Sequence, residues 1–259
     1  MSAGFSPPFN TPGKIIRASH LFRGDGRTLV VAMDHGMMGI TKGIEVIADT
    51  IEKVIKGGAD GVLINFGIAR KLADRLAGRI GIVLSIPFDV KYVELAVKIG
   101  ADAVKTTYFG PVPLSEERMK QISEIAQAAD DWQIPYMVEV VPTDEKGKVV
   151  YDLEQAVKAA RVGAELGGDI VKTEYVGPVE KYREVTGSCP VPIVVMGGAK
   201  MDSPLDVLKM VWEAVKAGAA GGTIGRNIWQ HKNPEKMTEA IVKIIHENLS
   251  VEEAAKIIQ

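Results

Sequence analysis

The sequence predicts an α/β fold, a single-domain (β/α)₈ TIM barrel, and three observations support this. Short runs of β-branched and aliphatic residues alternate with amphipathic helical patterns, and strict alternation of this kind builds a parallel sheet. The helical patterns end in a recurring Gly-Ala-Asp signal that leads into the next apolar run. The length of 259 residues suits one closed barrel. No G-x-G-x-x-G motif follows the first run, as an open dinucleotide-binding sheet would require.

Eight apolar runs are predicted to be the strands of the barrel. They cover residues 28–34, 61–65, 81–86, 103–107, 136–141, 169–173, 192–196 and 222–224. The clearest amphipathic patterns between them predict helices over residues 43–56, 115–129, 152–166, 204–217 and 234–246. Both faces of a strand in a parallel barrel are buried, so these runs are almost continuously apolar. A polar residue at the end of such a run is therefore a candidate site residue.

The turns from helix to strand repeat one another. Residues 58–60 and 100–102 read Gly-Ala-Asp, residues 167–169 read Gly-Gly-Asp, and residues 218–220, Gly-Ala-Ala, are a weaker copy. Glycine supplies the left-handed backbone conformation that ends a helix. Repetition of one short turn favours a closed barrel over an open, doubly wound sheet.

The two ends of the chain are expected to lie outside the barrel proper, which spans residues 28–249. Residues 1–27 are predicted to cover the bottom of the barrel, with Leu21 and Phe22 buried. Residues 250–259 are predicted to form a helical tail, because Ser250 is followed three residues later by Glu253, as in a capping box. The apolar stripe of this tail packs either on its own barrel or on a neighbouring subunit.

Composition excludes several classes of function. Lysine and arginine number 31 and aspartate and glutamate number 33, without long runs of one sign, which argues against nucleic acid or an anionic membrane as a partner. The single cysteine, Cys189, cannot form an internal disulfide and favours a reducing, cytoplasmic location. No apolar stretch is long enough to span a bilayer, and no secretory signal is recognisable. Histidine and cysteine spacing suggests no metal, and we expect no cofactor.

Two lysines end predicted strands in closely matching segments. Lys172 lies in Ile-Val-Lys-Thr-Glu-Tyr-Val-Gly-Pro, and Lys105 in Ala-Val-Lys-Thr-Thr-Tyr-Phe-Gly-Pro. Desolvation lowers the pKa of a lysine, and a neutral amine can attack a carbonyl to form a Schiff base. Strands four and six contribute to one layer of a barrel, so a charged Lys105 is expected to lie near Lys172 and activate it. A purely structural lysine, paired with a carboxylate, is the alternative.

Two carboxylates are expected beside these lysines. Asp34 ends the first strand and can orient a lysine or shuttle a proton, or it can simply cap a helix. Glu139 interrupts the apolar fifth strand, where a carboxylate is costly unless it is paired. We therefore expect Glu139 to point into the barrel toward a lysine. It is either an acid/base catalyst or only the counter-ion.

The last two strands end in glycine-rich turns that predict a phosphate site. The first turn holds Gly197, Gly198 and Ala199, and the second holds Gly225 and Arg226. Barrel enzymes commonly bind phosphate with the loops after strands seven and eight, because bare backbone N–H groups can approach the oxygens. The Arg226 guanidinium adds a charged donor. Tight turn geometry alone is the structural alternative.

Together these motifs resemble the archaeal-type class I aldolases, the DhnA-type fructose-bisphosphate aldolases within the DeoC/LacD-like aldolases, over nearly the whole chain. The matching segments are Ala-Met-Asp-His-Gly at 32–36, Ile-Val-Lys-Thr at 170–173, Gly-Gly-Ala-Lys at 197–200 and Ile-Gly-Arg-Asn-Ile at 224–228. The resemblance implies Lys172 as the Schiff-base former, Asp34 as a catalytic carboxylate and the two glycine turns as the phosphate site. It also implies a phosphorylated ketose as substrate and a ring-shaped homo-oligomer, often a decamer.

The sequence departs from this family at strand five. The fructose-bisphosphate aldolases carry a catalytic tyrosine there, whereas this chain has Val141 followed by Pro-Thr-Asp. The proton role then passes to Glu139, Tyr108, Tyr175 or water, or the reaction differs. The run Cys-Pro-Val-Pro-Ile-Val at 189–194 resembles the branch of thiolases that process phosphorylated autoinducer-2. That acyl transfer on a phosphorylated diketone, a transaldolase-like synthase of aromatic precursors, and an inactive barrel with a binding role remain alternatives.

Overall fold

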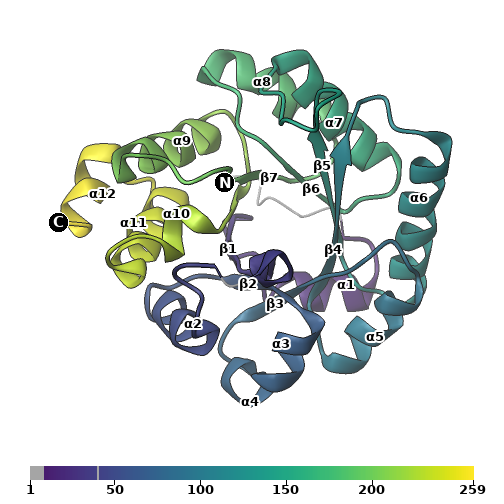
Figure 1. Cartoon of the computed structure of the whole chain (residues 1–259), viewed down its shortest axis with the longest axis horizontal. Coiled ribbons are helices and arrows are strands. Elements are labelled where there is room, and N and C mark those ends of the chain that lie inside the picture. Colours follow the sequence, from purple (N-terminus) through teal and green to yellow (C-terminus); the bar gives the residue numbers. More distant parts are fainter. Residues whose placement is uncertain (1–8, 40) are drawn as a thin grey trace.

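The computed structural model describes residues 9–39 and 41–259, and its centre is a closed barrel of parallel strands, as predicted (Figure 1). The strands are β1 (Thr28–Ala32), β2 (Gly61–Asn65), β3 (Gly81–Ser85), β4 (Ala103–Gly110), β5 (Tyr136–Pro142), β6 (Ile170–Thr173), β7 (Ile193–Met196) and β8 (Gly221–Ile224). Each strand pairs with its neighbours along the chain, and β8 closes the barrel on β1.

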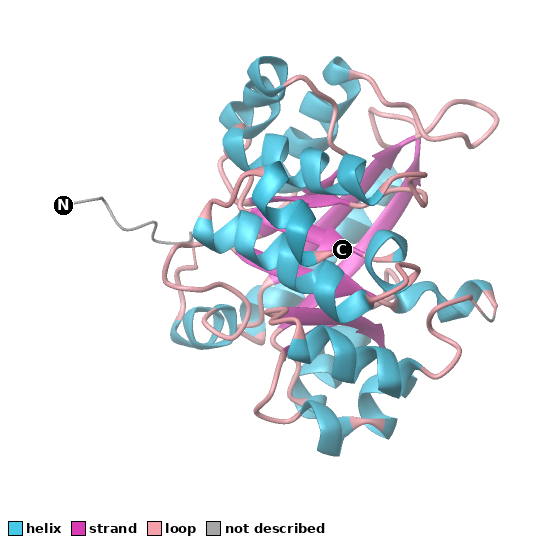
Figure 2. Ribbon diagram, turned by 90° about the vertical axis from the view of Figure 1, so that its left-hand side faces the viewer, coloured by secondary structure: helices cyan, strands magenta, loops and turns pink. Residues whose placement is uncertain are grey.

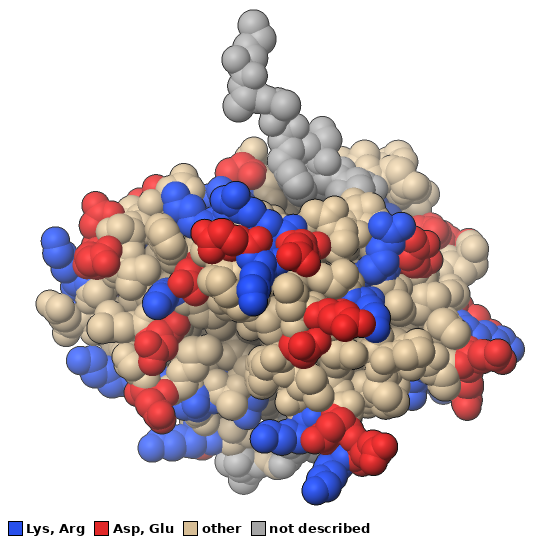
Figure 3. Space-filling view, turned by 90° about the horizontal axis from the view of Figure 1, so that it is seen from above, with Lys and Arg blue, Asp and Glu red and all other residues tan. Residues whose placement is uncertain are grey.

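Helices surround the strands on all sides (Figures 1 and 2). They are α1 (Pro12–Ala18), α2 (Ile47–Lys56), α3 (Phe66–Lys71), α4 (Ala73–Leu76), α5 (Lys91–Ile99), α6 (Glu116–Asp131), α7 (Leu153–Glu165), α8 (Val179–Ser188), α9 (Pro204–Lys216), α10 (Arg226–Trp229), α11 (Pro234–Glu247) and α12 (Val251–Ile257), with a 3₁₀ helix η1 (Asp34–Met38) after β1. None of the helices in the described residues is both long and apolar enough to cross a membrane. Acidic and basic side chains intermingle on the face that Figure 3 shows.

Two strand ends differ from the predicted bounds by more than one residue. β1 ends at Ala32, because Asp34 already begins η1, so this carboxylate stands on a tight turn rather than on a strand. β4 continues to Gly110 and pairs with β5 as far as Pro142. These two strands therefore rise above their neighbours, and a hairpin closed by a bridge between Thr143 and Val149 follows β5.

The lower half of the barrel interior is apolar and closed from below. One buried cluster joins inward-facing strand residues to residues of the segment before β1. Its members are Phe9, Ala18, Leu21, Phe22, Val30, Ala32, Leu63, Val83, Ala103, Met137, Ile170, Val194 and Ala220. A larger cluster fills the layer between the strands and the helices. The buried charged groups Lys105, Glu139 and Lys172 lie instead toward the carboxyl ends of the strands, which is where a TIM barrel carries its active site.

The repeated Gly-Ala-Asp turns have a structural role that the sequence reading did not identify. Each aspartate ties its own strand to the preceding one by accepting a backbone N–H. The pairs are Asp60 Oδ2 with Leu29 N at 2.6 Å, Asp102 Oδ2 with Ile82 N at 2.8 Å, and Asp169 Oδ2 with Tyr136 N at 2.9 Å. Alanine replaces aspartate in the fourth copy, at Ala220, which cannot make this bond.

Basic side chains from the segment before β1 pair with these same aspartates. Lys14 lies 2.7 Å from Asp169 and 2.5 Å from Asp130, although its side chain is only 2% exposed. His20 contacts Asp102 at 2.6 Å, and Arg23 contacts Asp60 at 2.5 Å. Ion pairs therefore fasten this segment to the bottom of the barrel, opposite the polar end.

Candidate active site

A cavity of about 370 Å³, here called the reaction chamber, opens at the carboxyl ends of the strands. Every site residue predicted from the sequence lines it, together with residues the prediction missed. The lining residues are Ala32, Asp34, His35, Lys105, Thr107, Phe109, Glu139, Val149, Tyr151, Lys172, Met196, Gly197, Gly198, Ala199, Thr223, Gly225 and Arg226. Closure of the barrel brings these positions together, because all eight carboxyl ends meet around one mouth.

The Glu139 carboxylate lies between the two lysines. Its Oε1 is 2.7 Å from Lys172 Nζ, and its Oε2 is 3.0 Å from Lys105 Nζ. The register explains this arrangement, since Glu139 on β5 pairs with Lys172 on β6, while Lys105 stands two positions before the partner of Glu139 on β4. Glu139 therefore points into the barrel, as expected.

Lys105 has more partners than Lys172. Its ammonium donates to Asp34 Oδ2 at 3.0 Å, to Glu139 Oε2 at 3.0 Å and to Thr107 Oγ1. An ammonium group has three donors, so these contacts use all of them. Lys172 has the single ion-pair partner Glu139 among the described residues. Lys105 thus lies in the same chamber as Lys172, with the carboxylates of Asp34 and Glu139 around its ammonium group.

Burial and ion pairing act in opposite directions on these groups. Burial favours a neutral Glu139, but the ammonium groups of Lys105 and Lys172 outweigh it and lower the pKa of Glu139 to about 2. The same balance lowers the pKa of Asp34. Burial also favours a neutral Lys105, yet the carboxylates of Glu139 and Asp34 raise its pKa. Both carboxylates and Lys105 are therefore ionised at neutral pH.

Asp34 is positioned by its place at the start of η1. Asn65 donates to the backbone carbonyl of Asp34 at 2.9 Å, which fixes the turn after β1. His35 follows it and packs edge-on against Trp229, with ring centroids 5.6 Å apart. Burial lowers the pKa of His35, so its ring is neutral at pH 7.

Side chains of the turn after β8 organise the turn after β7. Asn227, fully buried, donates to the carbonyl oxygens of Gly197 at 2.7 Å and Ala199 at 3.0 Å, and Arg226 donates to that of Gly198 at 2.9 Å. In a trans peptide the N–H points opposite to the C=O. The N–H groups of Gly198, Ala199 and Lys200 therefore face away from these side chains, which suits an anion.

Backbone geometry explains two of the glycines in these turns. Gly198 has a φ of 63°, in the left-handed region that favours glycine. A Cβ atom on Gly225 would lie 2.6 Å from the carbonyl oxygen of Ala32, so only glycine fits where β8 passes β1. Three polar atoms of the chamber are buried without a hydrogen-bond partner among the described residues: His35 Nδ1, Thr223 Oγ1 and Arg226 Nε.

The tyrosines proposed for the proton role lie outside the reaction chamber. Tyr108 donates to the carbonyl of Pro111 at 3.1 Å and packs beside Arg118. Tyr175 donates to Glu213 at 3.2 Å and lines a neighbouring cavity. Val141, predicted to stand where the family has its tyrosine, is fully buried and has no ionisable group.

Tyr151 and Phe109 line the reaction chamber but were missed in the sequence reading. The hairpin after β5 brings Tyr151 back over the mouth of the barrel, and the extension of β4 brings Phe109 there. Both side chains are largely exposed, at 60% and 63%. Their signal in the sequence is weak, since both lie beyond the predicted strands.

Comparison with known proteins decides the family. The model of the DeoC/LacD family aldolases matches residues 28–231, the whole barrel from β1 past α10. The chain belongs to the DeoC/LacD family of aldolases. Among curated members, this aldolase is 33% identical to an uncharacterized aldolase of Saccharolobus solfataricus, over 95% of this chain and 99% of that protein. It is 35% identical to 2-amino-3,7-dideoxy-D-threo-hept-6-ulosonate synthase 1 of Archaeoglobus fulgidus, over 93% of this chain and 94% of that protein.

Solved structures agree with this family. This DeoC/LacD family aldolase resembles a Schiff-base-forming fructose-1,6-bisphosphate aldolase with a TM-score of 0.78 and 27% identity, over 89% of this chain and 99% of the other. It resembles an archaeal fructose-1,6-bisphosphate aldolase, whose catalytic lysine is covalently bound to a carbinolamine intermediate, with a TM-score of 0.77 and 27% identity, over 89% and 98% of the two chains. The chain is thus a class I aldolase of the DeoC family in fold and sequence.

Proposed function

We propose that this aldolase forms a Schiff base between Lys172 and a phosphorylated ketose. The observation that carries the proposal is the unequal pairing of its two chamber lysines. Lys105 has every donor engaged and a raised pKa, whereas Lys172 has one ion-pair partner among the described residues and lies in the same chamber as the glycine turns. A nucleophilic amine must reach the neutral state, so Lys172 is the better candidate.

The reaction follows from an amine in this position. The neutral Lys172 amine adds to the ketone carbon, and the carbinolamine loses water to give an iminium ion. With the iminium at the second carbon of the ketose, a base removes the proton of the hydroxyl group on the fourth carbon. The bond between the third and fourth carbons then breaks, and its electrons form an enamine. An aldehyde leaves. Protonation of the enamine and hydrolysis of the resulting iminium release the second product and restore the amine.

The two carboxylates have different roles in this proposal. Glu139 is the counter-ion that holds both lysines, because Lys172 occupies its Oε1 and Lys105 its Oε2, which leaves neither oxygen free to accept the substrate proton. Asp34 touches only Lys105 among the lysines and retains a side chain that is 16% exposed toward the chamber. Its carboxylate is the group that accepts the substrate hydroxyl proton.

The phosphate of the ketose is proposed to bind between the turns after β7 and β8. Support comes from the aligned N–H groups of residues 198–200 and from the unpartnered Nε of Arg226 among the described residues. These donors lie at the carboxyl end of the barrel, the usual place for phosphate binding in this fold.

A second candidate is a synthase that transfers the cleaved fragment to another aldehyde instead of releasing it. The Archaeoglobus fulgidus relative at 35% identity is a named ulosonate synthase, and Val141 removes the tyrosine expected of a fructose-bisphosphate aldolase. Both candidates share the Schiff base at Lys172. Acyl transfer on a phosphorylated diketone does not require the iminium.

One experiment tests the proposal. The protein is incubated with a ketose phosphate and sodium borohydride, which reduces an iminium to a stable secondary amine, and the modified peptide is found by mass spectrometry. We expect the added mass on the peptide that contains Lys172. Modification on another lysine, or none with any ketose phosphate, refutes the assignment.

A further inference from the structure

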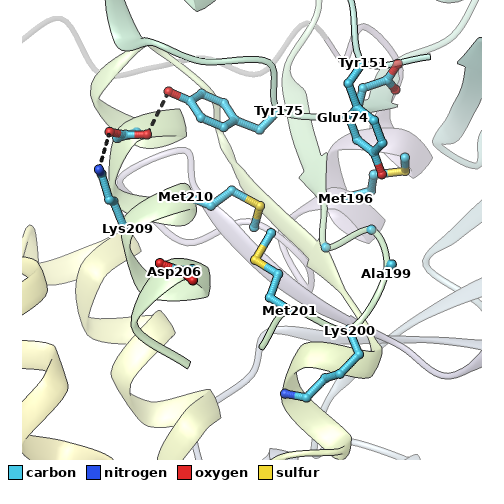
Figure 4. A pocket seen from close by; sticks show the side chains of 13 residues that line it. Tyr151, Glu174, Tyr175, Met196, Ala199, Lys200, Met201, Asp206, Lys209 and Met210 are labelled. Carbon is cyan, nitrogen blue, oxygen red and sulfur yellow. Dashed lines mark hydrogen bonds and ion pairs between the residues drawn. The ribbon is translucent and has the colours of Figure 1, made fainter. Parts of the chain in front are cut away.

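A second cavity adjoins the reaction chamber and has no part in the chemistry proposed above. This side cavity has a volume of about 470 Å³ and lies between the ends of β6 and β7 and helix α9 (Figure 4). It shares Tyr151, Met196 and the turn 197–199 with the reaction chamber. The two spaces therefore meet along Tyr151 and the proposed phosphate turn.

Most polar groups on the α9 side of the cavity satisfy one another. Tyr175 donates to Glu213 Oε2 at 3.2 Å, and Lys209 lies 3.9 Å from Glu213 Oε1, a chain drawn with dashed lines in Figure 4. The thioethers of Met201 and Met210 face the middle of the cavity, beside these polar contacts. Methionine side chains are flexible and apolar, so this wall adapts to the carbon skeleton of a ligand.

Glu174 is the exception on the opposite side, beside Tyr151. The residue is only 1% exposed, and its Oε1 is buried without a hydrogen-bond partner among the described residues. Its Oε2 accepts from Thr173 at 3.2 Å. Burial raises the pKa of Glu174 to about 7, so near neutral pH the carboxyl can donate or accept a hydrogen bond. A buried polar atom of this kind costs free energy unless a ligand satisfies it.

The position of Glu174 relative to Lys172 suggests what that ligand is. Glu174 lies two residues after Lys172, at the end of β6, which is roughly 7 Å farther along the strand direction. A ketose bound covalently to Lys172 through its second carbon extends outward from the barrel. Its far end then reaches the level of Glu174.

We propose that the side cavity binds the far end of the ketose chain, where Glu174 recognises a free hydroxyl group and disfavours a second phosphate. This proposal rests on the proposed Schiff base at Lys172. Besides Glu174, the cavity has the carboxylates of Asp206 and Glu213, while the ammonium of Lys209 faces Glu213. A phosphate here would meet carboxylates, whereas a hydroxyl hydrogen-bonds to the carboxyl in either protonation state.

Fructose 1-phosphate and fructose 1,6-bisphosphate form a matched pair of probes, because they differ only at the far end. The concentration of each that gives half-maximal borohydride trapping on Lys172 is measured at about pH 8, above the pKa of Glu174. We expect the monophosphate to trap at a concentration about tenfold lower than the bisphosphate, the scale of one charge-assisted hydrogen bond.

Two variants test whether Glu174 causes the preference for the monophosphate. Glu174→Leu should raise the half-trapping concentration of fructose 1-phosphate about tenfold and remove the preference. Glu174→Gln keeps a hydrogen bond but removes the charge, so the monophosphate should change by less than about threefold while the bisphosphate binds better. Glu154→Gln, which removes an exposed carboxylate that lines neither cavity, is the matched control and should leave the preference unchanged.

The outcomes separate this proposal from the proposed function. Trapping of both sugars at equal concentrations, or a preference unchanged in Glu174→Gln, overturns the hydroxyl subsite and leaves the Schiff base intact. Trapping of neither sugar on Lys172 overturns the Schiff base and the subsite together. If Glu174→Leu does not fold, the isosteric Glu174→Gln still tests the proposal, through its effect on the half-trapping concentration of fructose 1,6-bisphosphate.

Discussion

Glu139 lies 2.7 Å from Lys172, and this short contact joins neighbouring strands inside the barrel. The same carboxylate holds Lys105, so one acidic group serves two lysines. Because Asp34 adds a second carboxylate to Lys105 alone, the two lysines differ in environment although their sequences nearly match. This difference leads to the first prediction.

Replacing each lysine in turn should distinguish the nucleophile from its neighbour. We expect Lys172→Met to abolish borohydride trapping of a ketose phosphate, because the amine itself is lost. Lys105→Met should retain trapping on Lys172 but slow turnover, since Asp34 and Glu139 lose their common partner. Mass spectrometry of the trapped peptide is the measurement. Trapping that survives Lys172→Met and disappears in Lys105→Met would reverse the assignment.

Glu139→Gln should destabilise the fold in a pH-dependent way. The folded-state pKa of about 2 lies below the ordinary 4.5, so the carboxylate contributes about 3 kcal/mol of stability above pH 4.5, lost as the pH falls toward 2. The difference in unfolding free energy between wild type and variant should shrink over this range in urea titrations. Glu154→Gln, in an exposed pair with Lys158, is the control and should cost less than about 1 kcal/mol. A difference independent of pH contradicts the prediction.

Glu174→Gln should show the opposite pH dependence. The folded-state pKa of about 7 lies above the ordinary 4.5, so ionisation of this buried group costs stability as the pH rises from 4.5 through 7. Glutamine does not ionise, so the free energy of unfolding of the variant should rise by about 3 kcal/mol relative to wild type between pH 4.5 and 7. Urea titrations at pH 5 and about pH 8 measure the change. An equal stability difference at both pH values would show that Glu174 titrates normally.

Arg226→Ala should weaken the binding of phosphorylated substrate selectively. Loss of a charge-assisted contact costs about 1.5–3 kcal/mol, roughly a 10- to 150-fold rise in KM for a ketose phosphate. The unphosphorylated sugar should change much less. Because Arg226 also donates to the carbonyl of Gly198, Arg226→Lys is the companion variant that keeps the charge without the planar fork. Equal losses for both sugars would indicate a structural role.

Lys14→Met should destabilise the bottom of the barrel without changing the chemistry. The variant leaves Asp169, whose side chain is 12% exposed, without its ammonium partner, and breaking a buried pair costs about 3–5 kcal/mol. Lys158→Met removes an exposed ion pair and should cost less than about 1 kcal/mol. Thermal unfolding and trapping on Lys172 are measured on both variants. Loss of trapping by a folded Lys14→Met variant would contradict the expectation that Lys14 affects stability but not the chemistry.

The sequence by itself determined the barrel and the place of its candidate active site. Alternation of apolar runs with helical patterns specifies parallel strands, and closure brings their carboxyl ends to one mouth. A polar residue that ends such a run therefore reaches that mouth whatever its partners are. Asp34, Lys105, Glu139 and Lys172 were predictable on this basis, as were the glycine turns after β7 and β8.

Only the tertiary structure decided which of these groups touch. The nearly identical segments around Lys105 and Lys172 acquire different partners because Asp34, on the turn after β1, reaches one of them alone. Tyr151 joins the chamber through a hairpin, and Glu174 and helix α9 come to line one cavity. Such contacts join residues far apart in the chain, and strand register and side-chain packing set their distances, which no local pattern of residues encodes.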